Sequence, residues 1–412
     1  VGVLVGHTPT RLYVMGEEAT EREASTDEIE QMRQIVDEAL DAGALGFATS
    51  KSPTHVGFKG KPVPSRVASL DELDTLASTL ENRGAVMQVT AGKGFWFDEY
   101  ETLSKKYGMT ISWTAMLAGM ASPDAHIAQQ RRSTELAEQG LPIVPQVTPR
   151  PLCFEFQFKE PFPFEALPVF KPISGADFDG KKALYANAEF RAAAKEKMDN
   201  VRPSFRLAWE NSLISSCPSK PEYEERTVIN VATELGVHTM DLGFDLALEN
   251  ELEARFRMPV ANADEDEVEK LITDKNTVIG LSDAGAHASQ LCDAGLPTYL
   301  LGHWVRDKQV ITFEEAIRML SSRPAEVFGI SDRGLLQEGR PADVLVVDPQ
   351  TVHCGKLDRV YDQPAGQDRL IAEAFGIESV IVNGTLLRQQ GEDQVDPKGE
   401  LPGQLLRGGK AS

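Results

Sequence analysis

Short apolar runs alternate along this chain with segments whose apolar residues recur at helical spacing. The runs cover residues 1–6, 44–49, 85–90, 109–115, 141–147 and 277–282. Apolar side chains three to four residues apart fill the segment from Ile29 to Leu40 after the first run, and recur from Leu73 to Leu80 after the second. Strands that alternate with helices in this way predict βα units and a parallel sheet.

Two of the expected helices begin with the same local signal. Ser25 and Glu28 stand three residues apart just before one helical segment, and Ser69 and Glu72 before the next. This spacing is that of a capping box, in which the serine and the glutamate each bind a free backbone N–H of the first turn. We therefore expect a capping box at both helix starts.

The six apolar runs are candidate strands of a barrel. A closed (β/α)8 barrel needs eight strands, so the chain offers two too few. It also opens on Val1-Gly2-Val3 without a methionine, as though entering in the middle of a sheet. We expect an α/β fold, an incomplete TIM-type (β/α)8 barrel, and interpret the chain as an N-terminally truncated fragment.

The alternation is interrupted between residues 151 and 275. Three helical patterns lie there, at 181–198, 222–235 and 264–274, and phenylalanines gather at its start. The alternation of Phe154, Phe156 and Phe158 predicts an edge strand or flap packed on the core; as a lid it would suit an acyl chain. We expect a helical insertion or lid over 151–275, between barrel segments 1–150 and 276–330.

The C-terminal part has a different pattern. An apolar strand ends near Asp348, and Asn383-Gly384 separates two apolar runs as in a two-residue hairpin. The polar stretch 391–412 is expected to be a loose tail. Residues 331–412 are therefore predicted to form the C-terminal part of a small β-sandwich, followed by this tail.

Composition and charge exclude several kinds of partner. The formal net charge is −21, which opposes nucleic acid and anionic membranes because both require basic patches. No run is long enough to span a membrane and no signal peptide is visible, so a cytoplasmic location is expected. The four cysteines are widely spaced and form no CxxC pair, which indicates free thiols.

The run 277–282 ends in Asp283, which small residues and His287 follow. A buried strand that carries a carboxylate to its C-terminal tip is how a parallel barrel presents a catalytic acid or base to its loops. The alternative is that Asp283 only caps the following helix. We predict that Asp283 is catalytic.

Several segments together resemble a known family. They are 283–287 (Asp-Ala-Gly-Ala-His), 302–306 (Gly-His-Trp-Val-Arg), 322–325 (Ser-Arg-Pro-Ala), and 333–335 followed by 342–344. These are similar to the C-terminal half of the amidohydrolase superfamily, and to its N-acyl-D-amino-acid deacylase (D-aminoacylase-like) branch. Gly6-His7 with Arg11, and residues 43–49, resemble the third and fourth barrel strands of that branch.

The resemblance implies a metal-dependent hydrolase with a β-sandwich built from both chain ends. The implied cofactor is a divalent metal, with zinc expected, and Asp283 is its implied ligand and proton acceptor. The family's His-x-His pair is absent from the chain and is expected upstream of Val1. Where the fifth and sixth strands would supply histidines, the chain has Gln88-Val89-Thr90 and Ser112-Trp113-Thr114, which fits a divergent, reduced site or a barrel that has lost its metal.

Four further residues are candidates for substrate binding. His7, with Arg11 beside it, either contacts substrate or anchors a loop. Arg150 in Pro149-Arg150-Pro151 could clamp a carboxylate or be structural. His287 either lies in the site or only forms a hydrogen bond in its loop.

The resulting hypothesis is a hydrolase of non-peptide C–N amide bonds, acting on small molecules such as N-acyl-D-amino acids. A cyclic amidohydrolase of the dihydroorotase or hydantoinase kind is a variant of this hypothesis, and a non-catalytic barrel acting as a binding protein is the alternative from another class. We expect the chain alone to be inactive, because the His-x-His ligands are not in it.

Overall fold

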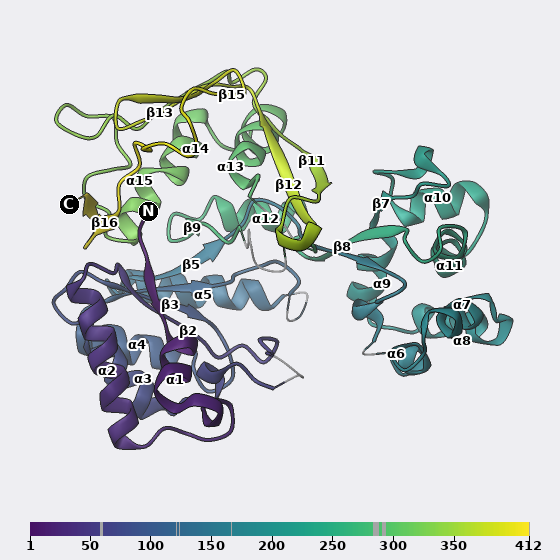
Figure 1. The fold of residues 1–412 in the computed structure, drawn as a ribbon, viewed down its shortest axis with the longest axis horizontal. Helices are drawn as coiled ribbons and strands as arrows, with labels where there is room; N and C mark the ends of the chain where they lie inside the picture. Colours follow the sequence, from purple (N-terminus) through teal and green to yellow (C-terminus); the bar gives the residue numbers. More distant parts are fainter. Residues whose placement is uncertain are drawn as a thin grey trace.

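A parallel sheet forms the centre of the molecule. The computed structural model describes residues 1–57, 61–120, 122, 124–165, 167–282, 288–290 and 294–411. Six strands pair in the order β1-β2-β3-β4-β5-β9, all in parallel (Figure 1). Their bounds are Leu4–Gly6, Gly46–Ser50, Val86–Thr90, Thr110–Thr114, Ile143–Val147 and Val278–Ile279. The six apolar runs therefore do pair side by side in chain order, as the alternation predicts.

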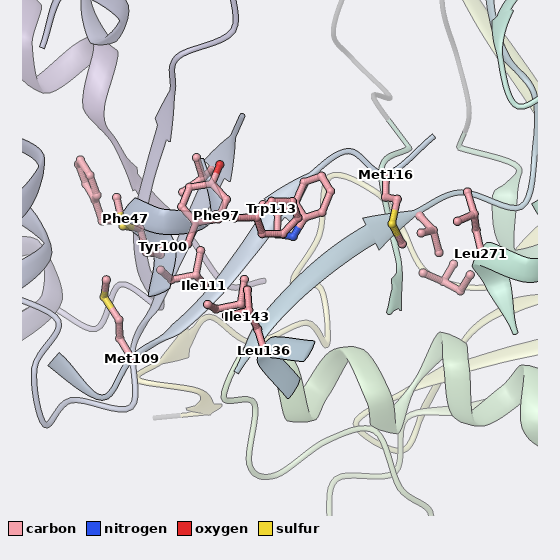
Figure 2. Packing of buried hydrophobic residues seen from close by; sticks show 14 of the residues in the cluster. Phe47, Phe97, Tyr100, Met109, Ile111, Trp113, Met116, Leu136, Ile143 and Leu271 are labelled. Atoms are coloured by element: carbon pink, nitrogen blue, oxygen red, sulfur yellow. The ribbon is translucent and has the colours of Figure 1, made fainter. Parts of the chain in front are cut away.

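Helices connect the strands and pack on one face of this sheet. They are α1 (His7–Met15), α2 (Thr26–Asp41), α3 (Leu70–Ser78), α4 (Phe97–Tyr107), α5 (Ala125–Glu138) and α12 (Glu265–Ile272). Alternate strand residues such as Phe47, Ile111 and Trp113 are fully buried against them (Figure 2). The intervening strand residues, among them Gln88 and Ser112, consequently point to the opposite face.

Only one of the two predicted capping boxes forms completely. At α2 the Ser25 side chain accepts from the Glu28 backbone, and Glu28 accepts from the Ser25 N–H at 2.7 Å. At α3 the Ser69 hydroxyl accepts from the Glu72 N–H at 3.2 Å. The Glu72 carboxylate does not accept from the Ser69 N–H, because it points into the interior and pairs there with His7 and Arg11. The prediction of a second complete box is therefore wrong.

Residues 152–261 build a second core away from the parallel sheet. An antiparallel sheet of order β6-β8-β7 (Leu152–Gln157, Arg255–Ala261 and Leu213–Ser216) lies against helices. The helices are α6 (Lys171–Ser174), α7 (Phe178–Ala186), α8 (Ala188–Asp199), α9 (Pro203–Glu210), α10 (Val228–Leu235) and α11 (Thr239–Glu249). β6 is at the sheet's edge, as predicted, and Phe156 and Phe158 are buried in this second core. α12 instead packs in the main core through Val268 and Leu271.

The C-terminal part combines short helices with antiparallel strands. The helices are α13 (Leu296–Tyr299), a π-helix (Leu300–Asp307), α14 (Phe313–Leu320) and α15 (Ser322–Val327). One sheet has the order β10-β13-β14-β15 (Val344–Val347, Ile377–Val382, Thr385–Gln389 and Glu392–Asp393), and β11 (His353–Val360) pairs with β12 (Arg369–Phe375). The predicted Asn383-Gly384 hairpin joins β13 to β14, with both residues at positive φ, as a type I′ turn requires.

The last residues are not a loose tail, contrary to expectation. β16 (Leu406–Arg407) and β17 (Lys410–Ala411) pair with each other. Leu406 is buried and its N–H donates to the Val1 carbonyl at 2.7 Å, while the Gly408 N–H donates to the Gly43 carbonyl at 2.9 Å. These bonds hold the C-terminal segment against the start of the chain, which the polar composition of the segment could not reveal.

The described part of the chain contains no helix with the length and apolar character that a membrane span requires.

Candidate active site

The carboxyl ends of the parallel strands bring polar residues from distant parts of the chain to one edge of the sheet. His7 follows β1, Lys51 follows β2, and Arg150 lies three residues after β5. In parallel sheets flanked by helices this edge is where ligands bind. The candidate active site is therefore this edge and the loops that leave it.

The two predicted site residues of the last strand, Asp283 and His287, lie outside the residues that the structure describes. The described chain reaches Ser282. The Gly280 N–H donates to the Val147 carbonyl at 3.0 Å, which keeps the exit of β9 beside the end of β5. The catalytic role of Asp283 and the substrate-binding role of His287 stay predictions.

His7 and Arg11 meet in a fully buried charged cluster. His7 Nε2 lies 2.7 Å from Glu72 Oε1, and its Nδ1 lies 2.8 Å from Thr49 Oγ1. The second carboxylate oxygen of Glu72 accepts from the Arg11 guanidinium, and Arg11 Nη2 also donates to the Arg22 carbonyl at 2.9 Å. Because a carboxylate only accepts, a neutral His7 would donate from Nε2 to Glu72 and accept from Thr49 at Nδ1. All these polar partners lie within the protein, so substrate binding by His7 and Arg11 stays a prediction.

The protonation states of this cluster follow from burial and pairing. Burial lowers the pKa of His7 below its usual 6.5 and outweighs the opposite influence of Glu72. Burial by itself raises the pKa of Glu72, but His7 and Arg11 together outweigh it and leave that pKa below 4.5. At neutral pH the cluster is thus a neutral histidine beside a carboxylate–guanidinium pair.

Lys51 stands next to this cluster and is itself held by backbone groups. Its Nζ donates to the carbonyls of Arg66 and Ala68 at 2.8 and 2.7 Å. Burial lowers the pKa of Lys51, and Glu72 acts in the opposite direction. Neither Glu72 nor Lys51 stands out in the sequence as a site residue. The sequence around Glu72 indicates a helix cap. Lys51 could have been identified only from its position directly after a predicted strand.

Amides and hydroxyls occupy the strand positions on the face opposite the helices. Gln146 Nε2 donates to Ser112 Oγ at 3.0 Å, and Thr114 Oγ1 lies 3.1 Å from Thr90 Oγ1. Gln88 Nε2 approaches Thr114 Oγ1 at 3.5 Å. We call these five residues the strand-end polar set. Their groups can donate to or accept from a polar ligand, but they do not exchange protons near neutral pH.

The strand-end polar set does not fit a zinc ion, which binds thiolate, imidazole and carboxylate ligands. Among the residues that the structure describes, no group of three or more His, Cys, Asp or Glu side chains could hold a metal. The family resemblance leads one to expect histidines in the segments 88–90 and 112–114, and hydrogen bonds engage Gln88 and Ser112 there. The described residues by themselves are thus not a metal site.

Arg150, three residues after β5, is half-buried and contacts elements of the C-terminal part. Its Nη1 donates to Cys354 Sγ at 3.5 Å, and its guanidinium lies 5.3 Å from the centre of the Tyr299 ring. Burial raises the pKa of Tyr299 to about 12. His303 stacks on the same ring at 4.8 Å and contacts Glu265 at 2.8 Å, which is a structural environment. The predicted carboxylate clamp at Arg150 stays a prediction.

Comparisons with known proteins relate the chain to amidohydrolases. A family model described as Amidohydrolase family (Amidohydro_3) matches residues 185–388. An uncharacterised protein of Mycobacterium tuberculosis is 27% identical over 386 residues, covering 85% of this chain and 61% of that protein. The N-acyl-D-glutamate deacylase of Alcaligenes xylosoxydans xylosoxydans is 26% identical, covering 99% of this chain and 69% of the enzyme. The chain thus spans less than two thirds of the length of the first of these relatives and 69% of the second.

A solved structure shows the same fold. The N-acyl-D-glutamate deacylase from Bordetella bronchiseptica, complexed with zinc and a phosphonate inhibitor, superposes with a TM-score of 0.57. It is 24% identical, and the match covers 99% of this chain and 71% of that one. At this identity the likeness concerns the fold.

Proposed function

Because the chain belongs to the amidohydrolase superfamily, we propose that its protein hydrolyses non-peptide C–N amide bonds in small molecules, with N-acyl-D-amino acids as the substrate class. The observation that carries the proposal is the position of β9, which pairs in parallel with β5 and ends at Ile279, four residues before Asp283 in the sequence. Relatives named N-acyl-D-glutamate deacylase and D-aminoacylase support the substrate class.

In the proposed reaction, water adds to the amide carbonyl, the C–N bond breaks and the nitrogen leaves with a proton. A carboxylate at the strand tip suits this chemistry, because it can accept the proton of the water and return it to the nitrogen. We assign this task to Asp283. The predicted roles of Arg150 and His287 would be to bind the carboxylate and the polar groups of the substrate.

The proposal includes a divalent metal, with zinc first, because a solved relative is a zinc complex. The strand-end polar set does not fit this ion, so Asp283 is the one ligand that we assign from this chain. The proposed mechanism therefore contains no step that depends on a metal held by Gln88 or Ser112.

Replacing Asp283 by asparagine tests the proposal. Asp283→Asn keeps the size of the side chain but removes the oxygen that accepts a proton, so kcat should fall about a hundredfold to ten-thousandfold. The measurement is turnover of the full-length protein on a panel of N-acyl-D-amino acids and cyclic amides, with bound metal quantified. Asp179→Asn, an exposed carboxylate on α7, is the matched control and should leave turnover unchanged. Equal turnover of wild type and Asp283→Asn at equal metal content would contradict the assignment.

One observation favours a second candidate function. The amides and hydroxyls of the strand-end polar set suit a binding protein that holds a polar ligand without reacting with it. If the protein only binds its ligand, the zinc-loaded wild type should bind N-acyl amino acids reversibly and hydrolyse none of them. Turnover measured on the same panel of amides would show this.

A further inference from the structure

A pocket of about 560 Å³ lies beside the strand ends. Its walls come from the loop after β4, the strands β6 and β8, the 3-10 helix Phe162–Phe164 and the helix α9 with the residue before it. Among the residues that contribute are Met120, Phe154, Phe162, Ala208 and Met258. A volume of this size is typical of small-molecule sites, which range over roughly 300–1,000 Å³.

The lining is apolar and part of it is open to solvent. Met120 is 57% exposed, Phe162 38% and Val260 37%. Apolar side chains that gather at the rim of a hollow indicate a surface that binds something apolar. The neighbouring phenylalanines at 156 and 158 are buried in the second core, so this row of alternate aromatic residues extends from that core to the pocket, where Phe154 lies.

Arg202 is the one charged residue among the described residues that line the pocket. It is exposed, it precedes α9, and it has no ion-pair partner in the part of the chain that the structure describes. An apolar hollow with one free cation at its rim complements a ligand that has an apolar body and one anionic group.

The pocket is joined to the candidate active site by packed and hydrogen-bonded residues. Phe154 packs in one cluster with Ala115, which follows β4, and with Leu281, which follows β9. The buried Asn262, at the end of β8, accepts from the Ala118 N–H at 2.7 Å and donates to the Thr148 carbonyl at 3.0 Å. These contacts fix the pocket beside the carboxyl ends of β4, β5 and β9.

We infer that this pocket binds the acyl chain of the substrate, and that the substrate is an N-acyl amino acid whose acyl group is an extended apolar chain rather than acetyl. Arg202, which lines the pocket, then pairs with the carboxylate of the same molecule and takes the place of Arg150, the clamp predicted from the sequence. The inference rests on the proposed function, which supplies the amide between the two parts, and it adds which acyl group the protein prefers.

Binding of N-acylglycines with acetyl, hexanoyl and decanoyl chains tests the inference without a stereocentre. Titration calorimetry in the Asp283→Asn background keeps turnover slow during the measurement. Affinity should rise by about fourfold for each methylene that enters the pocket. Decyltrimethylammonium, which has an apolar chain and a cationic head, should bind more weakly than the decanoyl compound.

Variants of the pocket should change this dependence. Ala208→Trp fills the pocket and should remove most of the gain from acetyl to decanoyl, whereas Ala193→Trp on the exposed side of α8 should not. Arg202→Gln should weaken all anionic ligands by about tenfold, and Arg131→Gln, on an exposed position of α5, should not. If Ala208→Trp does not fold, Phe162→Ala at the exposed rim provides a second reduction of decanoyl affinity.

The outcomes separate the inference from the proposed function. Equal affinity for the acetyl and decanoyl compounds, or an unchanged chain-length dependence in both pocket variants, overturns the inference. If the wild type hydrolyses N-acyl amino acids without regard to chain length, the proposed function stands and the inference fails. If the chain-length dependence of binding is found but no N-acyl amino acid is hydrolysed, the pocket stands and the proposed function fails.

Discussion

At the residue scale, Glu72 shows that the sequence can predict one role for a side chain, here a helix cap, while the folded protein uses it in another, here a buried ion pair. Its spacing from Ser69 is that of a capping box, yet the carboxylate contacts His7 and Arg11 in the interior. Arg11 and Glu72 are both fully buried. A buried guanidinium needs an opposite charge close by, because leaving it unpaired costs far more than a helix cap contributes.

Glu72→Gln should therefore destabilise the protein strongly. The change leaves Arg11 as a buried charge without a counter-ion, and the expected loss in the free energy of unfolding is about 3–5 kcal/mol. Glu38→Gln, an exposed position on α2, is the control and should change it by less than about 0.5 kcal/mol. Urea denaturation of the three proteins measures both values. A loss below about 1 kcal/mol for Glu72→Gln would show that the cluster is not important for stability.

At the element scale, β6 joins two environments. Phe156 and Phe158 belong to the aromatic core of residues 152–261, while Phe154 faces the pocket. The Phe158 ring lies 5.4 Å from those of Tyr185, Phe244 and Phe256. This core shares no member with the buried cluster of the parallel sheet, which suggests that the two can loosen separately.

Phe158→Ala should loosen the second core selectively. Removing a fully buried phenylalanine costs about 3–5 kcal/mol, and the loss should appear as reduced protection from hydrogen exchange within residues 152–261. The strands β2 to β5 should retain their protection, because Phe158 has no place in their core. Phe47→Ala, in the main core, is the matched comparison and should reduce protection in the parallel sheet. Uniform loss over the whole chain in both variants would mean that the protein unfolds as one unit.

At the scale of the whole molecule, acid should destabilise the fold. The folded state holds His7 neutral with a lowered pKa, whereas the unfolded chain protonates it near its usual pKa of 6.5. The unfolded state therefore binds more protons below that pH, and stability falls as the pH decreases from about 6.5 towards the lowered pKa of His7. Glu72, whose pKa is also lowered, adds a further loss below about 4.5.

The expected slope between pH 6.5 and the folded pKa of His7 is at most about 1.4 kcal/mol per pH unit. Measuring the free energy of unfolding by urea at pH 7.5, 6.5, 5.5 and 5.0 would determine it. His7→Gln should remove most of this slope, whereas His353→Gln, on an exposed position, should keep it. A slope in His7→Gln equal to that of the wild type would assign the pH dependence to other groups.

Much of the architecture is predictable from the sequence, because the responsible forces act between residues close in the chain. The period of the apolar residues sets which segments are strands and which are helices, and it also predicts the six parallel strands. Asn383-Gly384 predicts its hairpin since few other residues adopt positive φ at low cost. The same pattern indicates that Asp283 follows a strand, which is the basis of the proposed chemistry.

Only the tertiary structure decided which distant groups meet. Glu72 lies 65 residues from His7, and no local signal distinguishes a glutamate that caps a helix from one that pairs with a buried arginine. The pocket needs the loop after β4, β6, β8 and α9 together, so neither the pocket nor the position of Arg202 at its rim can be recognised from any one segment. The C-terminal strands appear polar and irregular in the sequence, and they are ordered by hydrogen bonds to Val1 and Gly43. Period and turn chemistry are local properties of a chain, whereas burial, charge pairing and cavities depend on contacts that folding alone creates.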